Sequence, residues 1–291
     1  MKGKVSGKQP TSTSFKIVKV IISFIFALHS ISLMLPIVWG IIVSLTPTEF
    51  FMLNGFMKMP KTFDFYNYVD AFISIEAGGF TFMGMFTNSI WWTVGGALLG
   101  VFVSAATAYA VARYKFVGGP IIYWVAVISM MIPIMSNLTA LFKLSELLRI
   151  YNTPFMLVTQ MGGMGFNFIV LYSFFKGISG EYAEAAFIDG AGHFRVFITI
   201  YAPLAVPSMI ALGLTLFIGL WSDPQFPLLF MPEYPTLASG LYTYQIAIER
   251  EPGATPILYA SLLITTIPVI VLFVVFRNKF MDVQLSGGIK G

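Results

Sequence analysis

The sequence predicts an all-α integral membrane protein with six transmembrane helices and with both termini in the cytoplasm. Hydrophobic residues make up 57% of the 291 residues and charged residues only 10%, which is more apolar surface than a water-soluble core of this size buries. Six apolar runs are close to the roughly 20 residues that cross a hydrocarbon layer. Each is about twice as long as a membrane-barrel strand, and unpaired backbone groups are costly in lipid, so we expect helices.

The predicted spans are residues 17–44, 88–112, 120–142, 154–175, 204–221 and 256–276. The first run follows a basic tail, but it is longer than the apolar core of a secretory signal and no A-x-A-like site follows it, so we retain it as a membrane helix. Small residues recur at every fourth position of the second span and predict a face that a neighbouring helix approaches closely: Gly96, Gly100, Ser104, Ala108 and Ala112. Three prolines within spans are candidate kinks: Pro36, Pro133 and Pro268.

Positive charge predicts the orientation, because cytoplasmic loops are rich in Lys and Arg. Most of the 17 basic residues lie on the side of the two termini: Lys2, Lys4, Lys8, Lys16, Lys19, Arg113, Lys115, Lys176, Arg195, Arg277, Lys279 and Lys290. The other side carries Lys58, Lys61, Lys143, Arg149 and Arg250. We therefore expect a cytoplasmic tail (1–16), a first helix with an extracytoplasmic loop (17–87), a core (88–276) with a cytoplasmic loop (177–203), and a cytoplasmic C-terminal tail (277–291).

A second polar, proline-rich segment at 223–255 is expected on the extracytoplasmic side. Its aromatic side chains, among them Tyr234, Tyr242 and Tyr244, either pack a re-entrant turn against the bundle or stack on a sugar.

Several kinds of chemistry are missing from the sequence. The only Gly-Lys pairs, Gly3-Lys4 and Gly7-Lys8, are followed by Val and Gln, so no P-loop for ATP is present. There is no cysteine, and His29 and His193 are far apart in the predicted topology, so we expect no metal site. We predict no catalytic residue and no cofactor bound by this chain, and the net charge of +4 follows from topology without a nucleic-acid partner.

Apart from Lys19 at the edge of the first span, the spans contain no Asp, Glu, Lys or Arg, which argues against an ion-coupled carrier or a charged-ring channel. Candidate residues of a solute pathway are therefore uncharged: Asn137, Thr139, Gln160, Asn167 and Ser208. Each also fits an ordinary interhelical hydrogen bond.

The most distinctive pattern is Glu184-Ala185-Ala186, then Gly190 after three residues, then Ile200-Tyr201-Ala202-Pro203 after nine more. Good helix formers with acids in the first turn predict a helix from about residue 181 that Gly190 and Gly192 end. A second short helix is expected over 194–201, with Pro203 and Pro207 marking re-entry into the membrane. Glu184 and Asp189 are available to pair with basic residues of a partner.

This pattern resembles the loop signature of the membrane subunits of ATP-binding-cassette importers, with Ala202 where that family usually has Leu. Features along essentially the full chain resemble the carbohydrate-uptake type, which includes the permease MalG of the maltose transporter: Ala108-Tyr109-Ala110 with Arg113, Asn88-Ser89, Trp221-Ser222-Asp223 and the tail from Leu285 to Gly291.

The resemblance implies a type I importer in a bacterial or archaeal cytoplasmic membrane. This subunit would pair with a second homologous permease, two cytoplasmic ATPases holding ATP and Mg²⁺, and an extracytoplasmic solute-binding protein. The residues implied in ATPase coupling are Glu184, Ala185, Ala186, Asp189, Gly190, Gly288 and Lys290, and those implied in binding-protein contact are Tyr234, Tyr242 and Tyr244. The expected solute is a sugar or oligosaccharide; the alternatives are a permease for an amino acid, peptide or anion, and a channel or scaffold that does not couple to ATP.

Overall fold

The described part of the chain is mostly helical. The structure is a computed structural model that describes residues 13–131, 138–162, 165–249 and 252–288. Its elements are α1 (Thr13–Ser44), α2 (Thr48–Asn54), η1 (Gly55–Met57), α3 (Tyr66–Ser74), β1 (Glu76–Ala77), β2 (Phe80–Thr81), α4 (Phe82–Arg113), α5 (Gly119–Met131), α6 (Leu138–Leu147), η2 (Pro154–Met161), α7 (Phe166–Gly177), α8 (Glu181–Ile188), α9 (His193–Val196), η3 (Phe197–Tyr201), α10 (Ala202–Ser222), α11 (Gln225–Phe230), α12 (Leu237–Ile248), η4 (Pro252–Ala254) and α13 (Thr255–Gly288).

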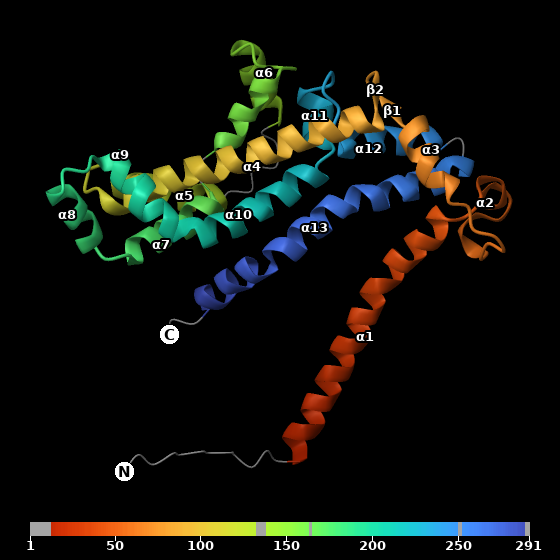
Figure 1. Ribbon diagram of the computed structural model, residues 1–291, viewed down its shortest axis with the longest axis horizontal. Helices are drawn as coiled ribbons and strands as arrows, with labels where there is room; N and C mark the ends of the chain where they lie inside the picture. The colour runs from red at the N-terminus through yellow and green to blue at the C-terminus, as the bar shows by residue number, and fades with distance from the viewer. Residues whose placement is uncertain (1–12, 132–137, 163–164, 250–251, 289–291) are drawn as a thin grey trace.

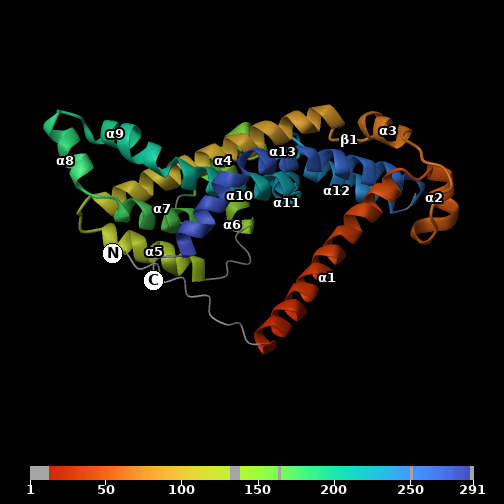
Figure 2. The same ribbon diagram turned by 60° about the horizontal axis from the view of Figure 1, so that its bottom comes forward.

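The long helices run along a body whose two ends are built from short elements. Figures 1 and 2 show α8 and α9 at one end and α2, α3 and the small antiparallel β1–β2 pair at the other. Between the two ends, α4 packs against α7, α10, α12 and η2, and α10 packs against α13. The short elements of residues 48–81 and those of residues 181–196 therefore lie at opposite ends of one helical body.

The small-residue face predicted on α4 is buried, as expected. Gly96, Gly100, Ser104 and Ala108 are buried, and Ala112 is half-buried. A Cβ atom added to Gly96 would lie 2.7 Å from Leu220 Cδ1 of α10, and one added to Gly100 would lie 3.0 Å from the backbone oxygen of Gln160 in η2. Glycine at these positions lets two neighbouring segments approach the α4 backbone directly.

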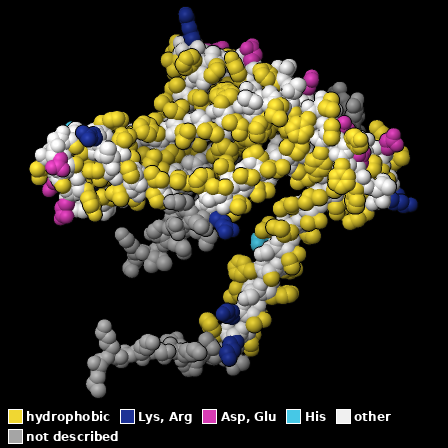
Figure 3. Space-filling view, in the orientation of Figure 1, with side chains coloured by type: hydrophobic (Ala, Val, Ile, Leu, Met, Phe, Trp, Pro, Cys, Tyr) yellow, Lys and Arg dark blue, Asp and Glu magenta, His cyan; other side chains and the backbone are white. Residues whose placement is uncertain are grey.

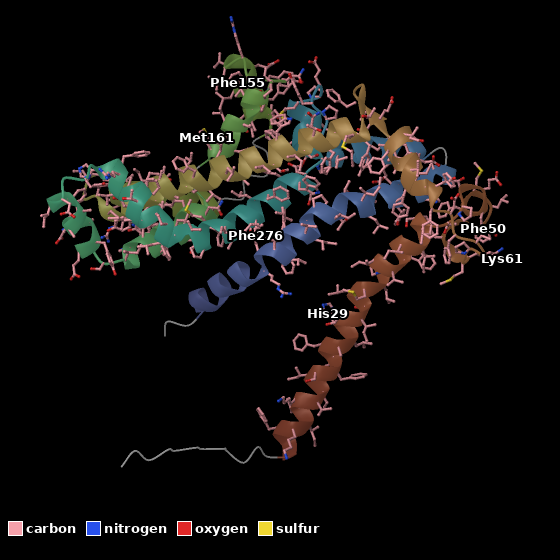
Figure 4. The ribbon with its side chains drawn as sticks, in the orientation of Figure 1. His29, Phe50, Lys61, Phe155, Met161 and Phe276 are labelled. Atoms are coloured by element: carbon pink, nitrogen blue, oxygen red, sulfur yellow. The ribbon has the colours of Figure 1, made fainter. Side chains whose placement is uncertain are left out.

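Helix α1 stands apart from the body and is attached mainly at its C-terminal end. None of its most apolar window is buried within the chain, and Figure 3 shows a rod covered by hydrophobic side chains. At the attached end, the buried Asn67 amide donates to the carbonyl oxygens of Ser44 and Thr46, each at 2.9 Å. The hydroxyls of Ser44 and Tyr68 are 2.8 Å apart. Figure 4 shows His29 partway along the free part of the helix.

Among the described residues, four helical segments are long and apolar enough to cross a membrane: Phe15–Ser44, Phe82–Arg113, His193–Ser222 and Thr255–Arg277. The pair η2 and α7 makes a fifth if its 51° bend lies within a single span. The expectation of one helix over 154–175 was therefore wrong, because η2 is a 3₁₀ helix and the chain turns before α7. Figure 4 labels Phe155 and Met161 on this segment.

The predicted span 120–142 is also not one helix in the described residues. It corresponds to α5, which ends at Met131, and to α6, which begins at Leu138 and continues past residue 142 to Leu147. Pro133, a candidate kink, lies outside the described residues. Pro36 and Pro268 lie inside α1 and α13.

The predicted boundary of the fifth span was wrong as well. The short helix expected over 194–201 is continuous with the span, because α9, η3 and α10 form one helical run from His193 to Ser222. η3 is a π-helical turn that ends at Tyr201, two residues before Pro203, which has no N–H to donate to the carbonyl of Thr199. The chain thus passes through the proline with a local change of helix type.

Candidate functional site: the exposed helix α8 and its attachment

Helix α8 presents two different faces. Ala183 and Ala186 are half-buried and pack against the aromatic core around Tyr109, Phe175 and Tyr201. The exposed face contains the other side chains of the helix: Glu181, Tyr182, Glu184, Ala185, Phe187 and Ile188. Of the Ala185-Ala186 pair, therefore, Ala186 faces the chain's own bundle and Ala185 faces outward with Glu184.

Gly190 is required by the way α8 ends. The helix stops in a Schellman motif, in which Ala191 N donates to Ala186 O at 2.9 Å and Gly190 N donates to Phe187 O at 3.0 Å. The motif needs a left-handed residue after the C-cap, and Gly190 has φ of +78°. Gly192, which the sequence also suggested as a helix terminator, has φ of −76° and is the N-cap of α9.

Arg113 fastens the segment that enters α8 to the end of α4. Its Nη1 donates to the carbonyl oxygen of Ile178 at 2.9 Å, and its Nη2 donates to that of Ser179 at 3.1 Å. Nη2 also donates to the hydroxyl of Tyr201, and the guanidinium carbon lies 4.9 Å from the centre of the Tyr201 ring. One side chain thus joins α4, the α7–α8 connection and the π turn.

A second set of contacts fastens the segment that leaves α8. The Tyr114 hydroxyl is 3.0 Å from His193 Nδ1 and 3.3 Å from the Tyr109 hydroxyl. The His193 ring also packs edge-on against Phe187 of α8, with centroids 4.9 Å apart. Because both flanks are attached, a force on α8 is passed to the end of α4 and to the start of the long helix that contains α10.

The outer surface of this end combines large apolar side chains with carboxylates. Tyr182, Ile188 and Phe194 are 57%, 86% and 72% exposed. Glu181, Glu184 and Asp189 are exposed beside them, and Figure 3 shows acidic side chains gathered there. Exposed anchors of this size, rimmed by charge, are typical of a protein-binding surface.

The candidate pathway residues come from several elements. Thr139 is exposed on α6, Gln160 is half-buried on η2, Asn167 is half-buried on α7, and Ser208 is buried on α10. Gln160 lies against Gly96 and Gly100 and donates to Thr159 Oγ1 at 3.2 Å. Within the described ranges no hydrogen bond joins any two of these four side chains. Asn137 lies outside the described residues.

The segment 223–255 forms α11 and α12 and packs against the start of α4. Asn88 Nδ2 donates to Pro235 O at 3.0 Å, and Leu237 N donates to Ser89 Oγ at 2.7 Å. Phe226 stacks on Trp92 with centroids 5.2 Å apart, which is the packing role left open by the sequence. In the sequence Asn88 and Ser89 stand out only through the family resemblance, because contacts with partners more than a hundred residues away leave no local pattern.

The three tyrosines of this segment have different surroundings. Tyr234 is half-buried with its ring centroid 6.3 Å from that of Trp91, and Tyr244 packs into the core around Trp221. Tyr242 is 47% exposed on α12. At the C-terminus, Gly288 is the last residue of α13, and Lys290 lies outside the described residues.

These features define a class: a multi-pass helical membrane protein that displays one firmly attached short helix at one end of its body. The chain belongs to the family described as binding-protein-dependent transport system inner membrane component, whose profile matches residues 96–280. The matched region contains most of α4, the whole α8 site and α10 to α12, together with most of α13. The protein is thus a transport subunit of a binding-protein-dependent system.

Similar proteins cover nearly the whole chain. The diacetylchitobiose uptake system permease protein of Streptomyces coelicolor is 28% identical over 87% of this chain and 82% of its own length. The galactooligosaccharides transport system permease protein of Bacillus subtilis is 28% identical over 94% of this chain and 96% of its own. A chain of a bacterial ABC transporter that imports the acidic polysaccharide alginate has a similar fold, with a TM-score of 0.75 at 20% identity, covering 92% of this chain and 98% of that one.

Proposed function

We propose that this chain is the permease subunit of an ATP-driven importer for a sugar or oligosaccharide. The observation that carries the proposal is helix α8, which displays Glu184, Ala185 and Ile188 while both of its flanks are hydrogen-bonded to long helices. A surface that must transmit force needs exposed contact groups on a rigid attachment, and α8 has both. The partner that docks on it supplies ATP and Mg²⁺, since this sequence contains no P-loop.

The assembly we propose has four further subunits around this one. A second homologous permease completes the solute pathway, two ATPases bind on the cytoplasmic side, and a solute-binding protein docks on the opposite side near α12. ATP-driven closure of the ATPases would move α8 and its counterpart together and rock the helical bodies around a central cavity. The tail that includes Gly288 and Lys290 would extend toward the ATPases.

We further propose six membrane crossings with both termini in the cytoplasm of a bacterial or archaeal cell. Support comes from the charge pattern and from the arrangement of the long helices. Lys115 follows α4 and Lys176 lies in the last turn of α7, both next to the α8 segment, whereas Lys58 and Lys61 follow α2, which Figure 1 shows at the other end. The bent pair η2–α7 and the pair α5–α6 would each account for one crossing.

The sugar class is supported by the names of the relatives. Besides diacetylchitobiose and galactooligosaccharides, they include a trehalose/maltose transport system permease of Thermococcus litoralis, 27% identical over 91% of this chain. The described spans also offer uncharged polar groups, which suit a neutral solute better than an amino acid or an inorganic anion.

The docking role predicts that Glu184→Lys abolishes transport and leaves membrane insertion intact. Reversing this exposed charge places a repulsive group where the ATPase is expected to offer basic residues. The matched control is Glu146→Lys, the same charge reversal at an exposed carboxylate on α6, outside the α8 surface. Both variants are measured in proteoliposomes for sugar uptake and for ATPase activity stimulated by the binding protein.

We expect uptake by the Glu184→Lys complex to fall at least about tenfold below that of the Glu146→Lys complex, because a desolvated charge repulsion costs more than about 1.4 kcal/mol. Normal stimulated ATPase activity in Glu184→Lys would show that α8 is not the docking helix.

A further inference from the structure

A hollow with mixed polarity lies between the end of α10, helix α12 and helix α13. Its volume is about 420 Å³, within the range of roughly 300–1,000 Å³ that small-molecule sites occupy. Much of its lining is aliphatic, and the rest combines aromatic, hydroxyl and amide side chains: Trp221, Ser222, Tyr242, Gln245, Thr265 and Thr266. None of these residues was among the candidates for a solute pathway.

One wall of the hollow is held rigidly. The Trp221 indole is buried, stacks on Phe217 with centroids 5.5 Å apart, and donates from Nε1 to the carbonyl oxygen of Thr265 at 3.0 Å. This hydrogen bond ties α10 to α13 across the hollow. Tyr242 contributes an aromatic ring that is about half exposed, on the facing helix α12. Rigid aromatic groups of this kind supply contact area at little entropic cost.

The polar groups suit a ligand with many hydroxyls. The hydroxyl protons of Ser222, Thr265 and Thr266 are used within their own helices, on the carbonyl oxygens of Ile218 and Leu262, so their oxygens are left as acceptors. Gln245 is exposed, and its amide carries both donors and an acceptor. Acyl chains offer no partner to the Gln245 amide, so a face toward lipid would leave this side chain unsatisfied.

The lining carries no charged side chain, and the nearest charge along the chain is acidic. Asp223 lies between two lining residues, Ser222 and Pro224, and one of its carboxylate oxygens accepts from Gln225 N at 2.8 Å. An anionic sugar such as a uronate would bury its carboxylate here without a basic partner and beside another carboxylate. A neutral sugar incurs no such cost.

We propose that this hollow is a subsite for one unit of a neutral saccharide, with Tyr242 as the stacking group and Gln245 as the main hydrogen-bonding group. The inference rests on the proposed sugar importer and adds to it the substrate class and the residues. Its position under α12 would place it where the solute leaves the binding protein and enters the membrane part.

The test measures sugar binding to the permease–ATPase complex in lipid nanodiscs without the binding protein, so that the binding protein does not set the preference. The probes are trehalose, maltotriose and diacetylchitobiose, with trigalacturonate as the anionic comparison, titrated by saturation-transfer NMR. The variants are Gln245→Ala, Tyr242→Leu and Gln245→Arg, and the matched control is Gln225→Ala, an exposed glutamine on α11 outside the lining.

For at least one neutral probe we expect the Kd to rise about 5- to 10-fold in Gln245→Ala and in Tyr242→Leu and to stay unchanged in Gln225→Ala, the size expected for one lost contact. We expect trigalacturonate to bind at least about tenfold more weakly than that probe. The Gln245→Arg variant should reduce the ratio of the two Kd values, because it adds a basic partner for the carboxylates. Equal Kd values for Gln245→Ala and Gln225→Ala, or no binding of any neutral probe, would overturn the subsite.

The same complex, reconstituted with its binding protein and ATP, separates this inference from the proposed function. Uptake of a neutral probe together with unchanged Kd values in the hollow variants would leave the importer standing and remove the subsite. Absence of ATP-dependent uptake for all three neutral probes would remove the proposed function itself.

Discussion

Gly190 and Gly192 are two residues apart, yet the backbone uses them differently. Gly190 has φ of +78° and nothing within 4 Å of an added Cβ, so its requirement is conformational; Gly192 has an ordinary φ of −76° and equally open surroundings. Gly190→Ala should therefore destabilise the last turn of α8 by about 1–2 kcal/mol, whereas Gly192→Ala should change it little. Hydrogen exchange at the amides of residues 190 and 191 measures the difference. Equal exchange in the two variants would contradict the Schellman assignment.

At the residue scale, the sequence predicted those site residues whose roles depend on neighbours a few positions away. Glu184 and Gly190 were found because a helix and its terminator lie within a few residues of each other. The attachment through Arg113 was not found, since two of its three acceptors, the carbonyls of Ile178 and Ser179, are backbone atoms more than sixty residues away. Because every residue carries a backbone carbonyl, residue type does not indicate which one accepts a hydrogen bond. Such a contact can be identified only from the folded structure.

At the element scale, the packing of α4 depends on the close approach of neighbouring segments to its backbone. The structure distinguishes a glycine that this approach requires from one that it does not. A Cβ at Gly100 meets a backbone oxygen at 3.0 Å, which cannot rotate away, while a Cβ at Gly213 of α10 meets only Val101 Cγ2 at an ordinary 3.5 Å. Gly213→Ala should be neutral or stabilising by up to about 1 kcal/mol through helix propensity. Gly100→Ala should lower stability by about 1–3 kcal/mol through overpacking.

Thermal unfolding of the purified complex in nanodiscs, followed by tryptophan fluorescence, compares the two variants. A Gly100→Ala protein at least as stable as Gly213→Ala would show that α4 and η2 can separate without cost.

Element length and hydropathy predicted α1, α4 and α13 well, because a long apolar run in lipid has one acceptable backbone state. They did not predict the bend between η2 and α7 or the continuity of α9 with α10. Hydropathy is blind to whether a backbone turn is α, 3₁₀ or π. Around Pro203, the missing N–H suggested an end, whereas a π turn keeps the helix going.

At the scale of the whole molecule, the fold determines which elements share an end, and the charge pattern predicts which end faces the cytoplasm. Because the chain has no cysteine, single introduced cysteines report this directly. Lys61→Cys and Lys115→Cys are matched exposed positions: Lys61 lies beside α2 (Figure 4), and Lys115 follows the end of α4 that is attached to the α7–α8 connection. A membrane-impermeant maleimide is added to cells whose cytoplasmic membrane is intact and whose outer layers let the reagent through. It should label Lys61→Cys and not Lys115→Cys. In inside-out vesicles it should label Lys115→Cys and not Lys61→Cys. Labelling of both from one side would refute the predicted orientation.

Because α1 is attached near Asn67 at one end only, a small rotation there produces a large displacement at the other end of the helix. About thirty residues at ~1.5 Å each make a rod of roughly 45 Å, held mainly where Ser44 and Thr46 meet the Asn67 amide. A tilt of about 10° at that pivot would carry the far end by about 8 Å. A sub-ångström adjustment around Asn67 and Tyr68 would therefore be magnified many times at Phe15, near the far end of the helix. A label at the start of α1 would be the most sensitive single reporter of rearrangement in the Asn67 region.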